Sequence, residues 1–272
     1  MRRMVIHAGF HKTGTTSAQT MIRINRTALD AHVRCYLRDD FMPLTRAART
    51  FSTRPDADTL DAVRTAAIAF FDTIDPEDPR DILMSSEDLS GHLPGRHGLD
   101  RYDAAGLIMS QLADTARARF GAGFDLVFYF STRSRDAWLR STWWQNLRVT
   151  RLTLDQTDYA DKITAAADLP AVLQEVAEAV APETVTFQAL EDIAALTFGP
   201  LTPLLDLLEI GEETRASLTA VAPENVQPEL GLDAVFLALN RSGLNAKHLS
   251  EAKRGLLQLA KRAPARKSRK TG

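Results

Sequence analysis

The stretch that decides the fold is V-I-H-A-G-F-H-K-T-G-T-T-S, residues 5–17. Its first residues belong to a short apolar run, Met4 to Ala8, which predicts a β-strand. From residue 17 the spacing becomes helical, with Met21 and Ile24 three positions apart. A strand, a glycine-containing loop and a helix in this order bring backbone N–H groups and the positive end of the helix dipole to one point. The loop is therefore expected to bind an anion.

The residues of this loop suit a phosphate group. Gly9 and Gly14 let the backbone approach a ligand closely, and Lys12 adds a positive charge. Four residues offer a hydroxyl group: Thr13, Thr15, Thr16 and Ser17. A tight turn with one Thr or Ser as the helix cap is the simpler interpretation, but it leaves the lysine and the other hydroxyls unexplained. We therefore favour phosphate binding.

Outward from this loop, apolar strands alternate with helical stretches. Further strands are predicted at residues 32–37, 81–85, 124–131 and 184–188. Helices are predicted at 58–74, 104–120 and 135–149, and after residue 200 at 200–209, 212–221, 230–239 and 246–261. The alternation predicts an α/β fold, with a parallel β-sheet flanked by helices and a helical C-terminal part. We expect one domain over residues 1–260.

The strongest strand carries a second motif at its end. F-D-L-V-F-Y-F-S, residues 124–131, is apolar almost throughout, which is typical of a central parallel strand buried on both faces. Arg133 follows it, and Ser141 lies eight residues further on the predicted helix. A guanidinium group presents a planar fork of N–H donors that matches phosphate oxygens. Ligands of open α/β sheets gather at the carboxyl ends of the strands, so Arg133 is a candidate phosphate contact.

Together these two motifs resemble a known family. The order K-T-G-T-T at residues 12–16 is not a Walker A motif, in which the lysine directly follows the second glycine. It resembles the loop of the sulfotransferases that use 3′-phosphoadenosine 5′-phosphosulfate (PAPS), and Arg133 with Ser141 matches their 3′-phosphate motif. The resemblance implies a P-loop-NTPase-like sulfotransferase fold and PAPS as co-substrate, with no metal. It further implies donor contacts from Lys12, Thr13, Gly14, Thr15, Thr16, Ser17, Arg133 and Ser141.

One family feature is missing. The Arg-Lys-Gly triplet with which cytosolic members contact the 3′-phosphate late in the chain has no counterpart here. Asn225, in A-P-E-N-V-Q-P-E, occupies a plausible loop for that contact.

The expected reaction, sulfuryl transfer to a hydroxyl or an amine of the acceptor, requires two further roles. Lys12 is placed to neutralise the charge that builds on the departing phosphate oxygen. The attacking hydroxyl must lose a proton, and in relatives a histidine or a glutamate accepts it. Glu87, at the end of the strand at 81–85, is the first candidate, although a solvated or capping carboxylate is the simpler alternative. His92 and His97, in the next loop, are the others.

Charge and composition limit the partners. The chain carries 33 basic and 35 acidic residues, and six of the basic ones lie in the tail at 261–272, which we expect to be disordered. The remaining body of 27 basic and 35 acidic residues has a charge of −8, so nucleic acid and polyanionic acceptors are not expected. The expected acceptor is a small molecule or a carbohydrate. Cys35 is the only cysteine, which excludes an intramolecular disulfide.

The first ten residues, M-R-R-M-V-I-H-A-G-F, have too short an apolar stretch for a signal peptide, and no segment is apolar enough for a membrane helix. We therefore expect a cytoplasmic protein. Besides a sulfotransferase, two classes stay open. A P-loop kinase or NTPase would use Asp88 to hold magnesium, and a binding or scaffold protein would use its basic tail.

Overall fold

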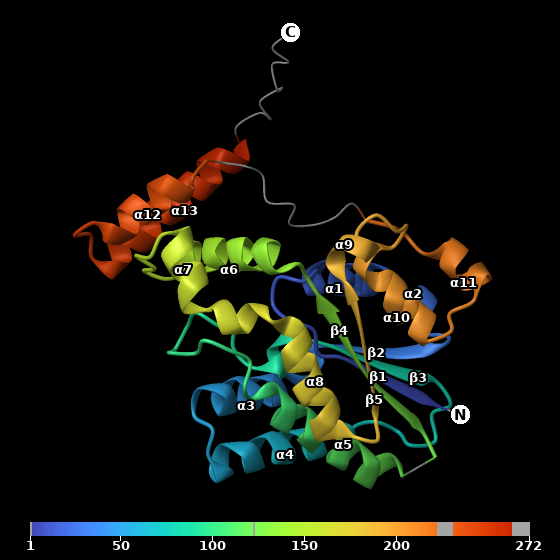
Figure 1. Cartoon of the computed structure of the whole chain (residues 1–272). Coiled ribbons are helices and arrows are strands. Elements are labelled where there is room, and N and C mark those ends of the chain that lie inside the picture. Colours follow the sequence, from blue (N-terminus) through green and yellow to red (C-terminus); the bar gives the residue numbers. More distant parts are fainter. Residues whose placement is uncertain (1, 122, 222–230, 263–272) are drawn as a thin grey trace.

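The computed structural model describes residues 2–121, 123–221 and 231–262. Its centre is a five-stranded sheet in the order β2-β3-β1-β4-β5, and every pair of neighbours is parallel (Figure 1). The strands are β1 (Arg3–His7), β2 (Val33–Leu37), β3 (Asp81–Ser85), β4 (Asp125–Thr132) and β5 (Thr184–Ala189). The predicted fold class, a parallel sheet flanked by helices with a helical C-terminal part, is confirmed.

Helices cover both faces of the sheet, because successive residues of a strand point to opposite faces. On one face, Val5 of β1 packs in a cluster with α1 (Thr15–Ile24), α2 (Arg26–Leu29) and α10 (Thr202–Leu207). Val127 of β4 belongs to the same cluster. The helix that follows the glycine loop is therefore fixed against the sheet.

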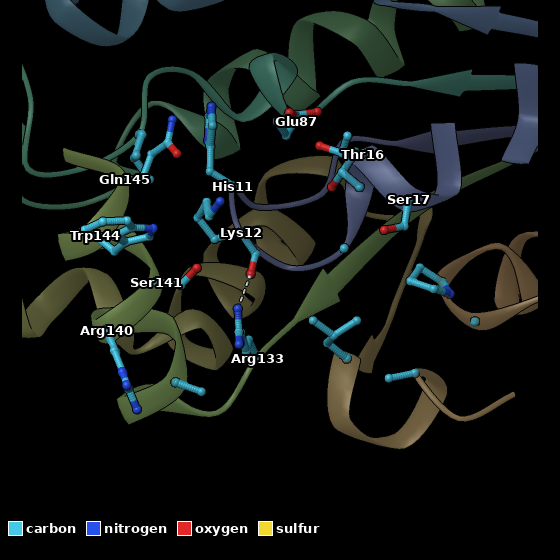
Figure 2. Close-up of a pocket in the computed structure, with 18 of the residues that line it drawn as sticks. His11, Lys12, Thr16, Ser17, Glu87, Arg133, Arg140, Ser141, Trp144 and Gln145 are labelled. Carbon is cyan, nitrogen blue, oxygen red and sulfur yellow. Dashed lines mark hydrogen bonds between the residues drawn. The ribbon is translucent and has the colours of Figure 1, made fainter. Parts of the chain in front are cut away.

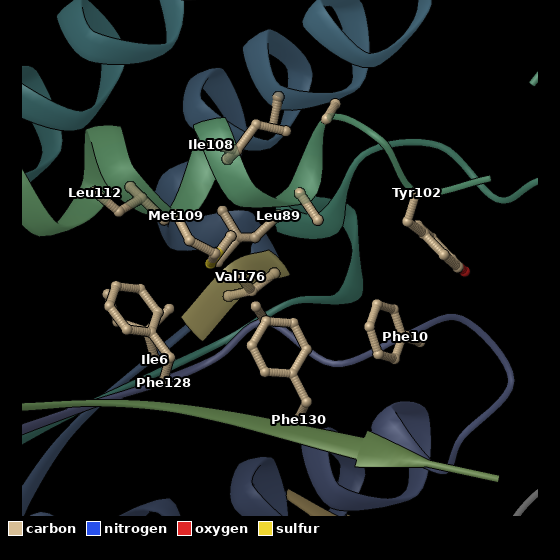
Figure 3. Close-up of a cluster of buried hydrophobic side chains, with 14 of the residues drawn as sticks. Ile6, Phe10, Leu89, Tyr102, Ile108, Met109, Leu112, Phe128, Phe130 and Val176 are labelled. Carbon is tan, nitrogen blue, oxygen red and sulfur yellow. The ribbon is translucent and has the colours of Figure 1, made fainter. Parts of the chain in front are cut away.

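The other face carries the larger part of the core. Ile6, Phe128 and Phe130 point from β1 and β4 toward α5 (Ala105–Phe120) and α8 (Leu169–Val180), as Figure 3 shows. Packed around them are α3 (Met42–Thr53), α4 (Ala57–Phe71), α6 (Arg135–Val149) and α7 (Gln156–Lys162). Residues of β4 enter both clusters, as expected for a strand that is buried on both faces.

Helix α3 has no counterpart among the predicted helices. Pro43 stands in its first turn, where the missing N–H costs nothing, and Leu44, Ala48 and Phe51 bury one face at helical spacing. Helix α7, which begins at Gln156, was likewise not predicted.

The remaining elements are short or lie late in the chain. Within the described residues, 3-10 helices cover Arg38–Phe41, Glu87–Ser90, Thr164–Ala167 and Gly199–Leu201. The late helices are α9 (Leu190–Ile193), α11 (Glu212–Ser217), α12 (Asp233–Arg241) and α13 (Ala246–Arg262). Helix α13 extends two residues into the predicted tail, and residues 263–272 lie outside the described part. Among the described helices, none is long and apolar enough to cross a membrane.

The burial of Phe130 in the core predicts how its substitution changes the free energy of unfolding. Phe130 is fully buried and its ring lies 5.2 Å from that of Phe10, so Phe130→Ala should lower the free energy of unfolding by about 3–5 kcal/mol, because a large cavity is left. Phe187, on the edge strand β5, is 51% exposed and serves as the control. Phe187→Ala should change stability by about 0.5 kcal/mol or less in urea unfolding. Similar losses in both variants would contradict the assignment of Phe130 to the core.

Candidate functional site

A cavity of 1480 Å³ lies at the carboxyl ends of β1, β3 and β4. It collects groups from the glycine loop, the end of β3, the end of β4 and helix α6 (Figure 2). Eight of the ten predicted site residues line it: Lys12, Gly14, Thr15, Thr16, Ser17, Glu87, Arg133 and Ser141. The two sequence motifs, more than a hundred residues apart, thus meet in one place.

Thr13 does not line the cavity. Its side chain is fully buried, and its hydroxyl bonds to the carbonyl of Phe10 at 2.6 Å and to the hydroxyl of Ser131 at 2.8 Å. Ser131 belongs to β4, so Thr13 ties the loop to the neighbouring strand.

His92 does not line the cavity either. Its Nδ1 accepts a hydrogen bond from Arg49 Nε at 3.3 Å, and its ring lies 4.6 Å from that of His97. Burial, followed by the charge of Arg49, lowers the pKa of His92 to about 4, so the ring is neutral at pH 7. The structure therefore separates both loop histidines from the lining that contains Lys12 and Glu87.

The loop has an unusual backbone. Lys12 has a φ of 70° and Gly14 a φ of 101°. The positive φ of Gly14 favours glycine there, and a Cβ would also crowd Leu190 Cδ1 at 2.9 Å and Pro200 Cγ at 3.0 Å. In the described chain, Gly14 is the N-cap of α1, without a side-chain cap and without an acidic residue in the first turn. The simpler interpretation, a Thr or Ser that caps the helix, is therefore not what the structure shows, and the positive end of α1 faces the cavity.

Electrostatics at the loop favour an anion. Burial, followed by the charges of Arg148 and Arg133, lowers the pKa of Lys12 to about 8, whereas the charge of Glu87 acts in the opposite sense. Burial and two like charges thus destabilise the protonated form of Lys12, and a bound anion would stabilise it.

Arg133 connects the two motifs directly. It follows β4, and its Nη1 donates to the carbonyl oxygen of Lys12 at 3.2 Å (Figure 2). Burial lowers its pKa, while Glu191 raises it. Glu191 is engaged by Ser134, whose N–H and hydroxyl both donate to Oε1. Ser141 is 6% exposed on α6 and borders the same cavity.

Glu87 begins the 3-10 helix after β3 and is partly exposed to the cavity. Its Oε2 accepts a hydrogen bond from Gln19 Nε2 at 3.1 Å, so α1 holds the carboxylate in position. Figure 2 shows Glu87 across Lys12 from the residues of α6. The simpler interpretation of Glu87 as a freely solvated carboxylate does not fit this placement.

The neighbouring Asp88 faces other partners. It forms ion pairs with Arg38 at 2.8 Å and with Arg49 at 3.8 Å, and His11 Nε2 lies 3.5 Å from it. Asp88 is not among the residues that line the cavity. A carboxylate paired in this way does not offer the magnesium site that a kinase would need at this point.

Buried aromatic side chains form hydrogen bonds with the backbone of the glycine loop. Trp138, fully buried, donates from Nε1 to the carbonyl of His11 at 2.9 Å, and the N–H of His11 donates to the hydroxyl of Tyr102 at 3.2 Å. His7 lies in the sheet with Nδ1 2.9 Å from the hydroxyl of Ser85, and burial lowers its pKa to about 4. These hydrogen bonds fix the backbone of His11, the residue before Lys12.

Trp143 and Trp144 play different parts, as expected from their adjacent positions on a helix. Trp143 is 6% exposed and donates from Nε1 to the carbonyl of Leu154. Trp144 is partly exposed at the cavity and its ring stacks on that of Phe236, 5.3 Å away.

Three arginines of the described lining, Arg96, Arg140 and Arg148, were not predicted. Arg148 lies seven residues after Ser141, which is two helical turns, so the period of α6 could have indicated it. Arg96 stands in the loop before α5 and gives no such signal. Asn225, suggested as a 3′-phosphate contact, lies outside the described residues.

No family model matches the sequence, and no curated protein matches it. Among solved structures, a sulfotransferase from Alicyclobacillus acidocaldarius is similar, with a TM-score of 0.47 and 12% sequence identity. The match covers 97% of this chain and 98% of the other. At this level of similarity, function has to be inferred from the residues of the site.

Proposed function

We propose that this chain is a PAPS-dependent sulfotransferase that transfers a sulfuryl group to a hydroxyl group of a small acceptor. One observation carries the proposal: the K-T-G-T-T loop and the Arg133–Ser141 pair line the same cavity, although they come from different parts of the chain. A donor that carries a phosphosulfate at one end and a phosphate at the other needs two such anion sites.

Each end of the donor has a matching set of groups. The positive end of α1, with Lys12 and the hydroxyl-bearing residues Thr15 to Ser17, suits the 5′-phosphosulfate. Thr15 Oγ1 is buried without a partner among the described residues, and a bound phosphate oxygen would supply one. Arg133 and Ser141 suit the 3′-phosphate. Thr13 contributes by anchoring the loop to β4.

The reaction uses Lys12 and Glu87. The acceptor oxygen attacks sulfur and forms the new S–O bond, while the bond between sulfur and the bridging phosphate oxygen breaks. The acceptor proton passes to the Glu87 carboxylate, and Lys12 stabilises the negative charge on the departing phosphate. The products are a sulfate ester and 3′-phosphoadenosine 5′-phosphate (PAP). No metal is needed for this step.

Titration calorimetry with PAP tests the proposal. We expect saturable binding with a dissociation constant in the micromolar range or below, unchanged by EDTA. Incubation with labelled PAPS and a panel of hydroxylated acceptors should then show transfer of the label. Absence of PAP binding, or magnesium-dependent ATP turnover in place of sulfuryl transfer, would favour the kinase or NTPase alternative.

Glu87→Gln should lower the turnover number about a hundredfold, because general-base catalysis typically contributes that much or more. PAP affinity should change less than about threefold, since the amide keeps the shape and removes a charge that lies across from Lys12. The matched control is Glu77→Gln, an exposed glutamate between α4 and β3 that does not line the cavity. Steady-state kinetics with an unchanged turnover number would rule out Glu87 as the base.

A further inference from the structure

Arg96 and Arg148 have no role in the donor scheme, yet they lie in the same cavity. Both act on Lys12: Arg148 depresses the pKa of Lys12 more than Arg133 does, and Arg96 depresses it as well. Positive charge is therefore concentrated around Lys12, because Arg96 and Arg148 add their charges to that of Arg133.

Arg96 is held by a buried network. Its Nε donates to Oδ1 of Asn146, which is fully buried on α6, while Nδ2 of Asn146 donates to the hydroxyl of Tyr159 at 2.7 Å and to the carbonyl of Pro94 at 3.3 Å. Gly95 permits this contact, because a Cβ there would lie 2.5 Å from the Tyr159 hydroxyl oxygen. These hydrogen bonds therefore hold the guanidinium group of Arg96 at the cavity.

Arg148 approaches from α6. Its guanidinium lies over the ring of Trp144, 5.6 Å from the ring centre, and its Nη2 donates to Oε1 of Gln145. The face of Trp144 is supported by the stacked ring of Phe236. Trp144 and Gln145 of α6 lie beside Lys12 in Figure 2, and both line the cavity together with Arg96 and Arg148.

Both guanidinium groups lack an anionic partner. In the described part of the chain, neither forms an ion pair, and Arg96 Nη2 and Arg148 Nε are buried without a hydrogen-bond acceptor. Burial lowers the pKa of each. A buried charge without a partner is costly, and an anion that bridges the two groups would remove that cost.

We propose that Arg96 and Arg148 bind an anionic substituent of the acceptor, whose apolar portion contacts the part of Trp144 that is exposed at the cavity. The inference rests on the proposed function, since it defines the acceptor of that reaction. A single carboxylate or sulfonate-like group fits two guanidinium forks. The acidic body of the protein, at −8 without the tail, repels an acceptor with many negative charges, so one charged group is favoured over a polyanion.

Matched aromatic probes test the site without knowledge of the natural acceptor. Protein saturated with PAP is titrated with benzoate, benzenesulfonate and the neutral isostere benzamide, at constant ionic strength, by calorimetry. We expect at least one of the two anions to bind in the millimolar range and about tenfold or more tightly than benzamide. The tighter of the two anions identifies the geometry of the natural substituent.

Arg148→Gln and Arg96→Gln should each reduce this preference about tenfold, whereas Arg64→Gln, an exposed arginine of α4, should leave it intact. PAP affinity should stay within about threefold of the original in all three variants. Equal binding of benzamide and the anions, no saturable anion binding up to about 100 mM, or a preference that survives both lining substitutions would overturn the inference. Failure of PAP itself to bind would instead overturn the proposed function.

Discussion

Replacing Lys12 with alanine is expected to abolish detectable PAP binding and to lower sulfuryl transfer about a thousandfold or more. A single preorganised donor at a developing anion is typically responsible for factors of 10² to 10³, and Lys12 adds a full positive charge to its donor groups. The ammonium borders the cavity, where the charges of Arg133, Arg148 and Glu87 act on it, and Lys12 is the only lysine among the described residues of the lining.

The fold should survive this substitution. The contact that ties Lys12 to β4 uses its backbone carbonyl, which accepts from Arg133 and is retained in alanine. Removal of a buried charge that is repelled by Arg133 and Arg148 also relieves an unfavourable interaction. The thermal midpoint should therefore be unchanged or slightly higher. Wild-type PAP affinity in a folded Lys12→Ala protein would refute the assignment of the loop.

The pH dependence of PAP binding gives a second measurement on Lys12. Its pKa in the free protein is lowered to about 8, and only the protonated form attracts the phosphate. Affinity should be fully present below pH 7 and should fall as the pH rises through 8, with proton uptake on binding at that pH. Lys12→Arg keeps its charge across this range, so calorimetry of that variant should show no such decline above pH 8. A flat profile for the original protein would contradict the depressed pKa.

The sheet and the meeting of the two motifs were predictable from local patterns. The run at 124–131 is too apolar for an exposed strand, and the glycine loop at 9–14 marks the end of another. Once both strands are parallel, Lys12 and Arg133 must emerge at the same edge, and the direct pairing of β1 with β4 brings them into contact.

Other parts of the site depend on contacts that no local pattern contains. The hydroxyl of Thr13 faces inward because it forms a hydrogen bond with Ser131 of β4. His92 forms a hydrogen bond with Arg49 of α3, a helix that was not predicted. Arg96 reaches the cavity only because Asn146, fifty residues later, holds it. Contacts between residues far apart in the sequence decide which polar residues of a loop face a ligand. The spacing of residues within the loop does not predict these contacts.

Arg133→Ala should weaken PAP binding about a hundredfold or more but leave the binding of adenosine 5′-monophosphate within about threefold. A bidentate, charge-assisted contact of a half-buried guanidinium accounts for a loss of that size. Adenosine 5′-monophosphate lacks the 3′-phosphate, so its binding does not include the contact with Arg133 that the substitution removes. The two nucleotides are compared by calorimetry on the same preparations. Arg135→Gln is the control, since Arg135 lies two residues further, is exposed, and donates to Thr164 instead of lining the cavity.

The comparison also separates two effects of the same side chain. Arg133 donates to the carbonyl of Lys12, so its loss could shift the loop instead of removing a phosphate contact. A shifted loop would weaken both nucleotides alike, because each carries a 5′-phosphate that the loop would bind. A loss confined to PAP assigns Arg133 to the 3′-phosphate, whereas equal losses would make it a positioning residue for Lys12 and leave the 3′-phosphate to Ser141 or another group. A general loss of stability would also weaken both nucleotides alike, so equal losses are assigned to the loop only when the thermal midpoint of the variant equals that of the original protein.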